Sequence, residues 1–393
     1  MTVENPVPFE NPVPFENSAP LENPAPVGNS AQIGTSAQIG NPAGVDDPVP
    51  FAFEAPGIAP AAAEDLLNRP PTPGQRVHAV LHRQPALSPF VVLVLACVAF
   101  GLLNTRFYRP QNLSLVFQQV AVVGSLAVGQ TLVILTAGID LSIGAVMVLS
   151  SLVMSKLANE HGVPGVFALA VGAAIAVLAQ TVNGLLVTRI KLPPFIVTLG
   201  TLSVFTAATL IYAKGQTVTL NPGAFLLWSG TTVSLGSVHL TTGVLMMIGL
   251  YIVIGFALRY TAWGRHLYAV GDDAEASRLA GIQVSRVLLS AYMVAGLAIA
   301  VAAWILIGRV GGGDPNSGLN ANLESITAVV IGGTSLFGGR GVVLGSLIGA
   351  LIVQVFDNGL ALAGLDPNYQ VLAVGLLVIA AVSVDQWIRS VKA

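Results

Sequence analysis

The sequence predicts an all-α, polytopic membrane protein with about ten transmembrane helices, and three observations support this fold class. Of the 393 residues, 54% are hydrophobic and only 9% are charged, whereas soluble domains contain about 25% charged residues. The mean hydropathy is +0.77. Apolar runs recur whose lengths are close to the roughly 20 residues that a helix needs to cross a bilayer. These observations favour a helical membrane protein over a soluble globular fold.

The apolar runs begin near Ser88 and define a transmembrane domain over residues 85–393. The eighth run is short, and the second and third meet at a small polar segment. The 42 glycines suit the close approach of helices in lipid. We expect ten spans, at about 88–105, 113–136, 141–158, 163–188, 195–213, 240–258, 287–308, 324–338, 342–362 and 370–388.

The Lys and Arg residues predict how the spans are oriented, because these residues concentrate in cytoplasmic loops. With the N-terminus inside the cell, twelve of the 17 Lys and Arg residues lie on the cytoplasmic side and five lie outside. We therefore expect both termini, and the basic loop Arg259–Arg286, to lie in the cytoplasm.

Residues 1–84 form a separate Pro-rich region, which we expect to be a disordered cytoplasmic tail. Residues 4–45 consist of seven six-residue repeats, beginning with ENPVPF and ending with GNPAGV. The later copies resemble the hexapeptide pattern of a left-handed β-helix, but so few copies give few stacked turns to bury a core. The prolines of the early copies favour an extended, solvated chain.

A small polar knot, Gly138–Ser142, interrupts the apolar stretch Gly129–Ser151. Asp140 within this knot is the only charged residue between Arg109 and Lys156. Exposing such a group to lipid costs several kcal/mol, so we expect it to face the protein interior or a wet cavity.

Two interpretations of the knot stay open. In the first, Asp140 is the N-cap of a helix that begins at Leu141 or Ser142. In the second, the knot is a helix break beside a transport path, since irregular backbone at membrane depth persists only where protein or water satisfies it. Intramembrane polar groups also form interhelical hydrogen bonds, which is the alternative role for each candidate. The candidate path residues are Gln130, Gly138, Asp140, Ser142 and Asn183.

The loop Arg259–Arg286 contains a short expected helix, Asp273 to Ala280. Asp272 is the expected N-cap, with Glu275 three residues later completing a capping box, and Gly281 ends the helix in the left-handed conformation. Short helices are marginal alone in water, so we expect this one to dock on a cytoplasmic partner; a helix held only by its own loop is the alternative. The docking-loop residues are Gly271, Asp272, Asp273, Glu275, Ala276, Leu279, Ala280 and Gly281.

A glycine-rich loop, Gly332–Gly341, resembles a phosphate cradle only superficially. No G-x-x-x-x-G-K-[ST] pattern occurs in the chain, and the loop holds no lysine. We expect its glycines to form a tight turn between short spans. Gly341, Gly345 and Gly349 then recur every four residues and predict one flat helix face for close packing, against this chain or a second copy.

The composition argues against several other functions. The net charge of −2 gives no reason to expect a nucleic-acid partner, and Cys97 is the lone cysteine, so a Cys-rich metal site is excluded. We expect no cofactor and no catalytic residues, because the five histidines are scattered outside span interiors and no convergent catalytic set is visible. A passive facilitator is a further alternative, but it has no need of a docking helix.

Three motifs, in this order, resemble a known family. They are GQTLVILTAGIDLSIGAVMVLSS, GRHLYAVGDDAEASRLAGIQVSR and ITAVVIGGTSLFGGRG. Together they resemble the permease subunits of bacterial sugar importers of the ATP-binding-cassette class, which include ribose, xylose, arabinose, galactose and fructose systems. The resemblance covers residues 85–393 and not the repeat tail. NANLESITAVVIGGTSLFGGRG, DPNYQ and VDQWIRS are most similar to fructose-type permeases.

The resemblance implies a multi-pass permease of the plasma (inner) membrane that carries a monosaccharide and is not itself an enzyme. It implies a homodimer or pseudo-dimer, a separate cytoplasmic ATP-binding subunit that hydrolyses ATP, and an extracytoplasmic sugar-binding protein. Under this resemblance, Asp272–Gly281 is the helix that couples to the ATPase, and the Gly138–Ser142 knot lies near the translocation path. Membrane lipid is the remaining partner.

Overall fold

The computed structural model describes residues 87–236, 238–318 and 320–366, together with parts of 368–383. The predicted tail, 1–84, lies outside the described residues, and so does most of the last expected span, 370–388. Residues 368–373 of that span region are helical.

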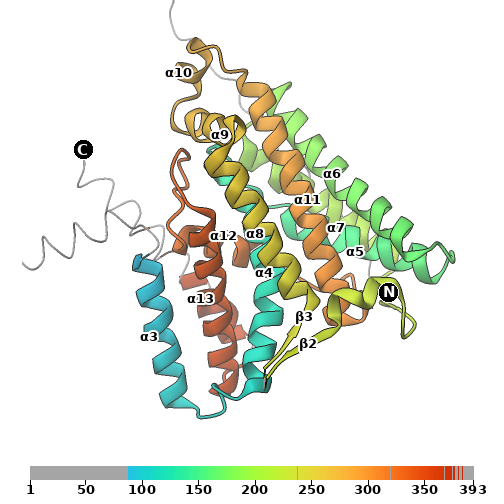
Figure 1. The fold of residues 1–393 in the computed structure, drawn as a ribbon. Helices are drawn as coiled ribbons and strands as arrows, with labels where there is room; N and C mark the ends of the chain where they lie inside the picture. The colour runs from blue at the N-terminus through green and yellow to red at the C-terminus, as the bar shows by residue number, and fades with distance from the viewer. Residues whose placement is uncertain are drawn as a thin grey trace, which may run out of the picture. The chain divides into compact units, whose positions relative to one another are not determined.

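The described part of the chain is predominantly helical, as the composition predicts (Figure 1). Six helices, α4, α6, α7, α8, α11 and α13, are long and apolar enough to cross a membrane, and α3, α5 and α12 are shorter apolar helices. These nine occupy the first nine expected spans. The helices are α3 (Leu87–Leu103), α4 (Pro110–Leu135), α5 (Ile143–Asn159), α6 (Gly165–Thr188), α7 (Pro194–Ala213), α8 (Thr242–Tyr260), α9 (Ala262–Asp272), α10 (Ala274–Leu279), α11 (Val284–Val310), α12 (Ala321–Ile331) and α13 (Val343–Leu362).

The helices differ greatly in how much of their surface the chain itself covers. Within the apolar stretch of α4, 89% of the residues are buried, and the figure for α11 is 67%. The corresponding shares are 28% in α6 and 17% in α7. The described core therefore centres on α4 and α11, which pack against each other, and α7 presents most of its apolar surface outward.

Two small antiparallel sheets lie in the connections between helices, and the sequence interpretation did not predict them. β2 (Thr232–Leu235) pairs with β3 (Val238–Thr241) at the end of α8 opposite α9 and α10 (Figure 1). β1 (Val218–Thr219) pairs with β4 (Gly312–Gly313), directly after α11. A 3-10 helix, η1 (Phe225–Gly230), packs against α11.

The helix α12 ends earlier than the expected span 324–338. It stops at Ile331 because Gly332 and Gly333 follow. Gly333 has a φ of 85°, a backbone conformation that residues with a side chain rarely adopt. The glycine-rich loop then turns the chain into α13, as expected.

The predicted glycine face belongs to α13 and meets α12 of the same chain. A Cβ atom on Gly345 would lie 2.1 Å from the Gly332 carbonyl oxygen, and one on Gly349 would lie 1.8 Å from the Ala328 carbonyl oxygen. Gly341 is not part of this face, because α13 begins only at Val343. Its Cβ position lies instead against the Thr334 side chain, within the loop. The four-residue helical spacing therefore applies to Gly345 and Gly349 alone.

Candidate functional site

The chain reverses direction between α4 and α5 at the polar knot. Ala137 adopts a left-handed φ of 60°, which is uncommon for a residue with a side chain. The amide of Gly138 donates to the Val133 carbonyl oxygen (3.0 Å), so a backbone hydrogen bond satisfies a carbonyl group in the last turn of α4. The knot is therefore a break between two helices. Its place beside a transport path, the other part of the second interpretation, stays a prediction.

Asp140 lies at the centre of the knot and is fully buried. Its Oδ1 accepts hydrogen bonds from the Ser142 amide (2.8 Å) and the Ser142 hydroxyl (2.7 Å), and its Oδ2 accepts one from Gln180 Nε2 (2.6 Å). The helix α5 begins at Ile143 with Ser142 as the N-cap position, so the expectation that Asp140 is the N-cap is wrong by two residues. The carboxylate nevertheless satisfies an amide at the start of the helix, because an Asp side chain readily bonds the amide two residues on.

A network of buried polar side chains extends from Asp140 into α6. Asn183 Nδ2 donates to the Ser142 hydroxyl (2.9 Å) and lies 3.4 Å from Gln180 Oε1. We call Asp140, Ser142, Gln180 and Asn183 the interior network; all four are 0% exposed. The sequence interpretation placed three of them near the path and missed Gln180. Its spacing from Asn183 could have indicated its role, since residues three apart share one face of a helix.

Two further helices bind the backbone of the knot. The Thr198 hydroxyl of α7 donates to the Ile139 carbonyl oxygen (2.8 Å), and Asn322 Nδ2 of α12 donates to the Leu141 carbonyl oxygen (3.3 Å). No sequence pattern near the knot predicts either contact, because both partners are distant along the chain. The knot is therefore held by side chains from three helices outside α4 and α5.

Some buried polar atoms of α4, α6 and α11 have no hydrogen-bond partner among the described residues. They are the hydroxyl of Tyr292, Oδ1 of Asn183 and both amide atoms of Gln130. Tyr292 packs beside the knot, since its hydroxyl would lie 3.4 Å from a Cβ atom on Gly138. Gln130 is fully buried in α4, but no hydrogen bond joins it to the interior network within the described part. Buried polar groups usually find partners, and an ordered water molecule would satisfy each of these atoms.

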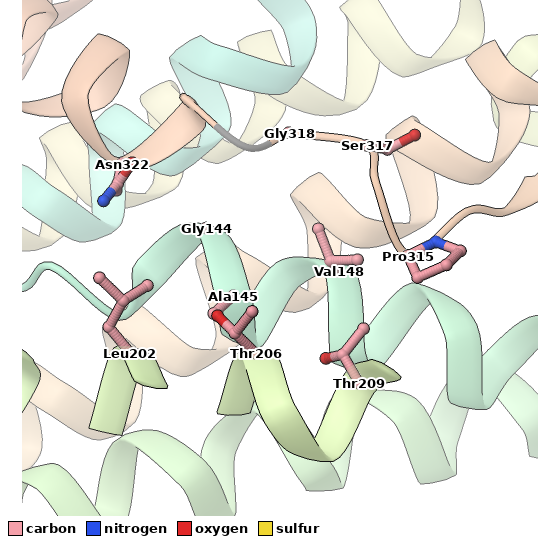
Figure 2. Close-up of a pocket in the computed structure, with 10 residues that line it drawn as sticks. All are labelled: Gly144, Ala145, Val148, Leu202, Thr206, Thr209, Pro315, Ser317, Gly318 and Asn322. Atoms are coloured by element: carbon pink, nitrogen blue, oxygen red, sulfur yellow. The ribbon is translucent and has the colours of Figure 1, made fainter. Parts of the chain in front are cut away.

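A small cavity adjoins the knot along the first turns of α5. Its volume is about 50 Å³, and it lies between α5, α7 and the segment that precedes α12 (Figure 2). Ligand pockets usually measure about 300–1,000 Å³, so this cavity cannot hold a monosaccharide in the described conformation. Its lining combines glycines, apolar side chains and polar groups, among them Thr206, Thr209, Ser317 and Asn322.

The loop between α8 and α11 contains two helices where the sequence predicted one. Thr261 caps α9 by accepting from the Gly264 amide (3.2 Å), and α9 continues through Asp272. The N-cap of α10 is Asp273, whose Oδ1 accepts from the amides of Glu275 and Ala276 (2.9 Å each). The prediction of Asp272 as the cap is therefore wrong by one residue, because Asp272 is still part of the preceding helix.

Glu275 does not complete a capping box. It forms an ion pair with Arg278 at the surface. The hydrogen bond from Arg278, followed by its positive charge, lowers the pKa of Glu275. Both side chains are exposed, so the pair contributes little to stability.

The end of α10 agrees with the prediction. Gly281 has a φ of 86°, and its amide donates to the Arg278 carbonyl oxygen (3.0 Å). The Ile282 amide donates to the Ser277 carbonyl oxygen (3.0 Å), which completes the Schellman motif. Ala276, Leu279 and Ala280 are exposed, and 76% of the Leu279 surface is accessible. The helix thus presents a small apolar surface outward.

The comparisons with known proteins identify the family. A family described as "Branched-chain amino acid transport system / permease component" matches residues 112–382. The chain belongs to this permease family. The permease is 48% identical, over 324 residues, to the fructose import permease protein of Rhizobium meliloti; the match covers 81% of this chain and 90% of that protein.

Two other relatives match over similar lengths. The permease is 38% identical to the ribose import permease protein of Bacillus subtilis, over 76% of this chain and 92% of that protein. It is 30% identical to the D-allose transport system permease protein of Escherichia coli, over 76% of this chain and 91% of that protein. No solved structure matches the chain.

Proposed function

We propose that this permease is the membrane subunit of an ATP-binding-cassette importer that carries a monosaccharide, with fructose and ribose as the first candidates, across the inner membrane. The observation that carries this proposal is the 48% identity to a fructose import permease over 90% of that protein. The ribose and D-allose relatives support the same substrate class. The family description, which mentions branched-chain amino acids, makes an amino acid the competing solute.

The proposed importer needs partners. Ala276, Leu279 and Ala280 form an exposed apolar surface at α10, which suits docking of a separate cytoplasmic ATP-binding subunit. Such a subunit would supply ATP hydrolysis, because the chain lacks the G-x-x-x-x-G-K-[ST] phosphate loop. An extracytoplasmic sugar-binding protein delivers the solute, and two copies of the permease assemble around the path.

The proposed path passes the polar knot. Asp140, Ser142 and Asn183 supply hydrogen-bond acceptors and donors in the protein interior, and Gly138 lets the Tyr292 hydroxyl approach beside them. Gln130 contributes unpaired amide atoms from α4. Because the adjoining cavity is about 50 Å³, passage requires a state in which the helices around the knot separate, as in alternating access.

Reconstitution tests this proposal directly. The permease is purified from its native membrane with the subunits that co-purify, placed in vesicles, and supplied with the sugar-binding protein on the outside and ATP on the inside. We expect ATP-dependent uptake of labelled fructose or ribose and no uptake with ADP. Uptake that is equal with and without ATP would identify a passive facilitator. ATP-driven uptake of leucine, without uptake of sugars, would show that the solute is an amino acid and not a monosaccharide.

The proposed orientation has a separate test. With Cys97 replaced, Glu275→Cys on α10 should resist a membrane-impermeant thiol reagent in intact spheroplasts, because both termini and this loop are assigned to the cytoplasm. Thr232→Cys on β2 is the matched control and should react, since Thr232 is exposed and lies on the proposed outer side. Ready labelling at 275 with protection at 232 would show that the orientation is opposite to the proposed one.

A further inference from the structure

Three separate segments meet at the end of α4 without side chains between them. They are the last turn of α4 with Ala137, the end of α9, and the glycine-rich loop between α12 and α13. The Gly339 amide donates to the Leu135 carbonyl oxygen (3.0 Å), and the Tyr268 hydroxyl of α9 donates to the Gly341 carbonyl oxygen (2.9 Å). The loop is therefore bonded to both helices.

The backbones at this junction are in direct contact. A Cβ atom on Gly271 of α9 would lie 1.8 Å from the Leu135 carbonyl oxygen and 2.7 Å from the Gly339 nitrogen. A Cβ atom on Gly338 would lie 2.6 Å from the Gly271 carbonyl oxygen and 2.8 Å from the Ala137 nitrogen. Real Cβ atoms do not approach other atoms so closely, so no larger residue fits here unless the segments move apart.

The junction adjoins both the helix α10 and the polar knot in the sequence. Gly271 and Asp272 end α9, and the next residue, Asp273, caps the exposed helix α10. On the other side, Ala137 is three residues before Asp140 of the interior network. A displacement of α10 thus has a short route to the knot, through the backbone contacts of Gly271 and Gly338 and the hydrogen bond from Tyr268 to Gly341.

We propose that Gly271, Gly338, Gly339 and Tyr268 are positioning residues of the transport cycle, which join the α9–α10 docking element to the polar knot. Movement of α10 on its partner shifts the end of α9, and the junction carries this shift to residues 135–138. The knot then changes its position relative to Gln180 and Asn183 on α6. This inference rests on the proposed function, because it presumes that α10 docks on an ATP-driven subunit.

Two substitutions of different size test the junction. Tyr268→Phe removes only the hydrogen bond to Gly341, and Gly271→Ala forces the α9 and α4 backbones apart. Their matched controls are Tyr260→Phe, at a side chain that is 62% exposed, and Gly249→Ala, where a Cβ atom meets nothing within 4 Å. The readout is the number of ATP molecules hydrolysed per sugar imported in vesicles, measured together with co-purification of the ATP-binding subunit.

We expect normal co-purification for all four variants and a raised ATP-to-sugar ratio for the two junction variants only. For Tyr268→Phe the ratio should rise by about threefold, the effect of one neutral hydrogen bond on an equilibrium. A purely structural role would lower the amount of folded protein and leave the ratio of the surviving molecules unchanged. If Gly271→Ala does not accumulate, Tyr268→Phe decides the question alone.

Different results would overturn the proposed function and the proposed role of the junction. A wild-type permease that shows no ATP-dependent uptake would overturn the proposed function. A wild-type permease that is coupled, together with a Tyr268→Phe variant of unchanged ratio and unchanged sugar-stimulated hydrolysis, would overturn the junction inference and leave the proposed function standing.

Discussion

Asp140 and Asp273 carry out the same local chemistry in opposite surroundings. Each accepts the amide two residues further on, Ser142 in one case and Glu275 in the other, at the start of a helix. Asp140 is fully buried and also binds Gln180, whereas Asp273 is exposed. A local capping pattern therefore does not distinguish a structural turn from an interior polar site, because the difference lies in what surrounds the carboxylate.

The largest expected effect follows from removing the buried carboxylate. Asp140→Ala leaves the Ser142 amide and Gln180 Nε2 without their acceptor, which should cost about 3 kcal/mol of stability. Thermal unfolding in detergent measures this loss, with Asp366→Ala at an exposed site as the control. An equal, small change in both variants would show that burial does not distinguish the two kinds of aspartate.

Asp140→Asn sharpens the same comparison. Asn keeps one side-chain oxygen that can accept from the Ser142 amide and loses the acceptor of Gln180 Nε2, so the fold should persist with a smaller loss of stability than in Asp140→Ala. If the negative charge serves transport, sugar uptake should nevertheless fall while the protein level holds. Normal uptake by this variant would leave Asp140 with a structural role alone.

Glycine substitutions extend the comparison to packing. Gly349→Ala places a methyl group where the Ala328 carbonyl oxygen of α12 now lies, and overpacking of this kind typically costs about 1–3 kcal/mol. Gly249→Ala on α8 meets no atom within 4 Å and should be neutral or slightly stabilising, because alanine favours the helix. Thermal unfolding of the two variants checks this contrast, which similar unfolding temperatures would contradict.

A smaller effect should separate the two adjacent acids of the docking loop. Asp273→Ala removes the cap of α10 and should destabilise this helix by about 1 kcal/mol, whereas Asp272→Ala leaves the cap in place. Hydrogen exchange at the amides of Glu275 and Ala276 reports the difference. Faster exchange in the Asp272 variant than in the Asp273 variant would restore Asp272 as the cap.

The smallest effect on stability, with a large effect on function, is expected on the outer surface of α10. Ala276→Arg or Ala280→Glu should leave unfolding unchanged, because both alanines are exposed. Each variant should lose co-purification with the ATP-binding subunit and sugar-stimulated ATP hydrolysis, because a charge would be forced into a packed contact. Unchanged assembly in both would make α10 a solvated connector.

The sequence by itself determined the fold class and the approximate position of the helices. Long apolar runs can satisfy their backbone in lipid only as helices, so hydropathy alone located α4, α6, α8 and α11 to within a few residues. It also located the helix break at the knot and the left-handed end of α10 at Gly281, because these depend on residue types within one turn.

Only the tertiary structure decided which groups surround those local features. Gln180 and Thr198 reach the knot from α6 and α7, and no pattern near Asp140 specifies them. The cap shifted from Asp272 to Asp273 because α9, which packs on α4, α8 and α11, continues through Asp272. Contacts between distant segments depend on how whole helices pack. Local patterns in one sequence do not specify that packing.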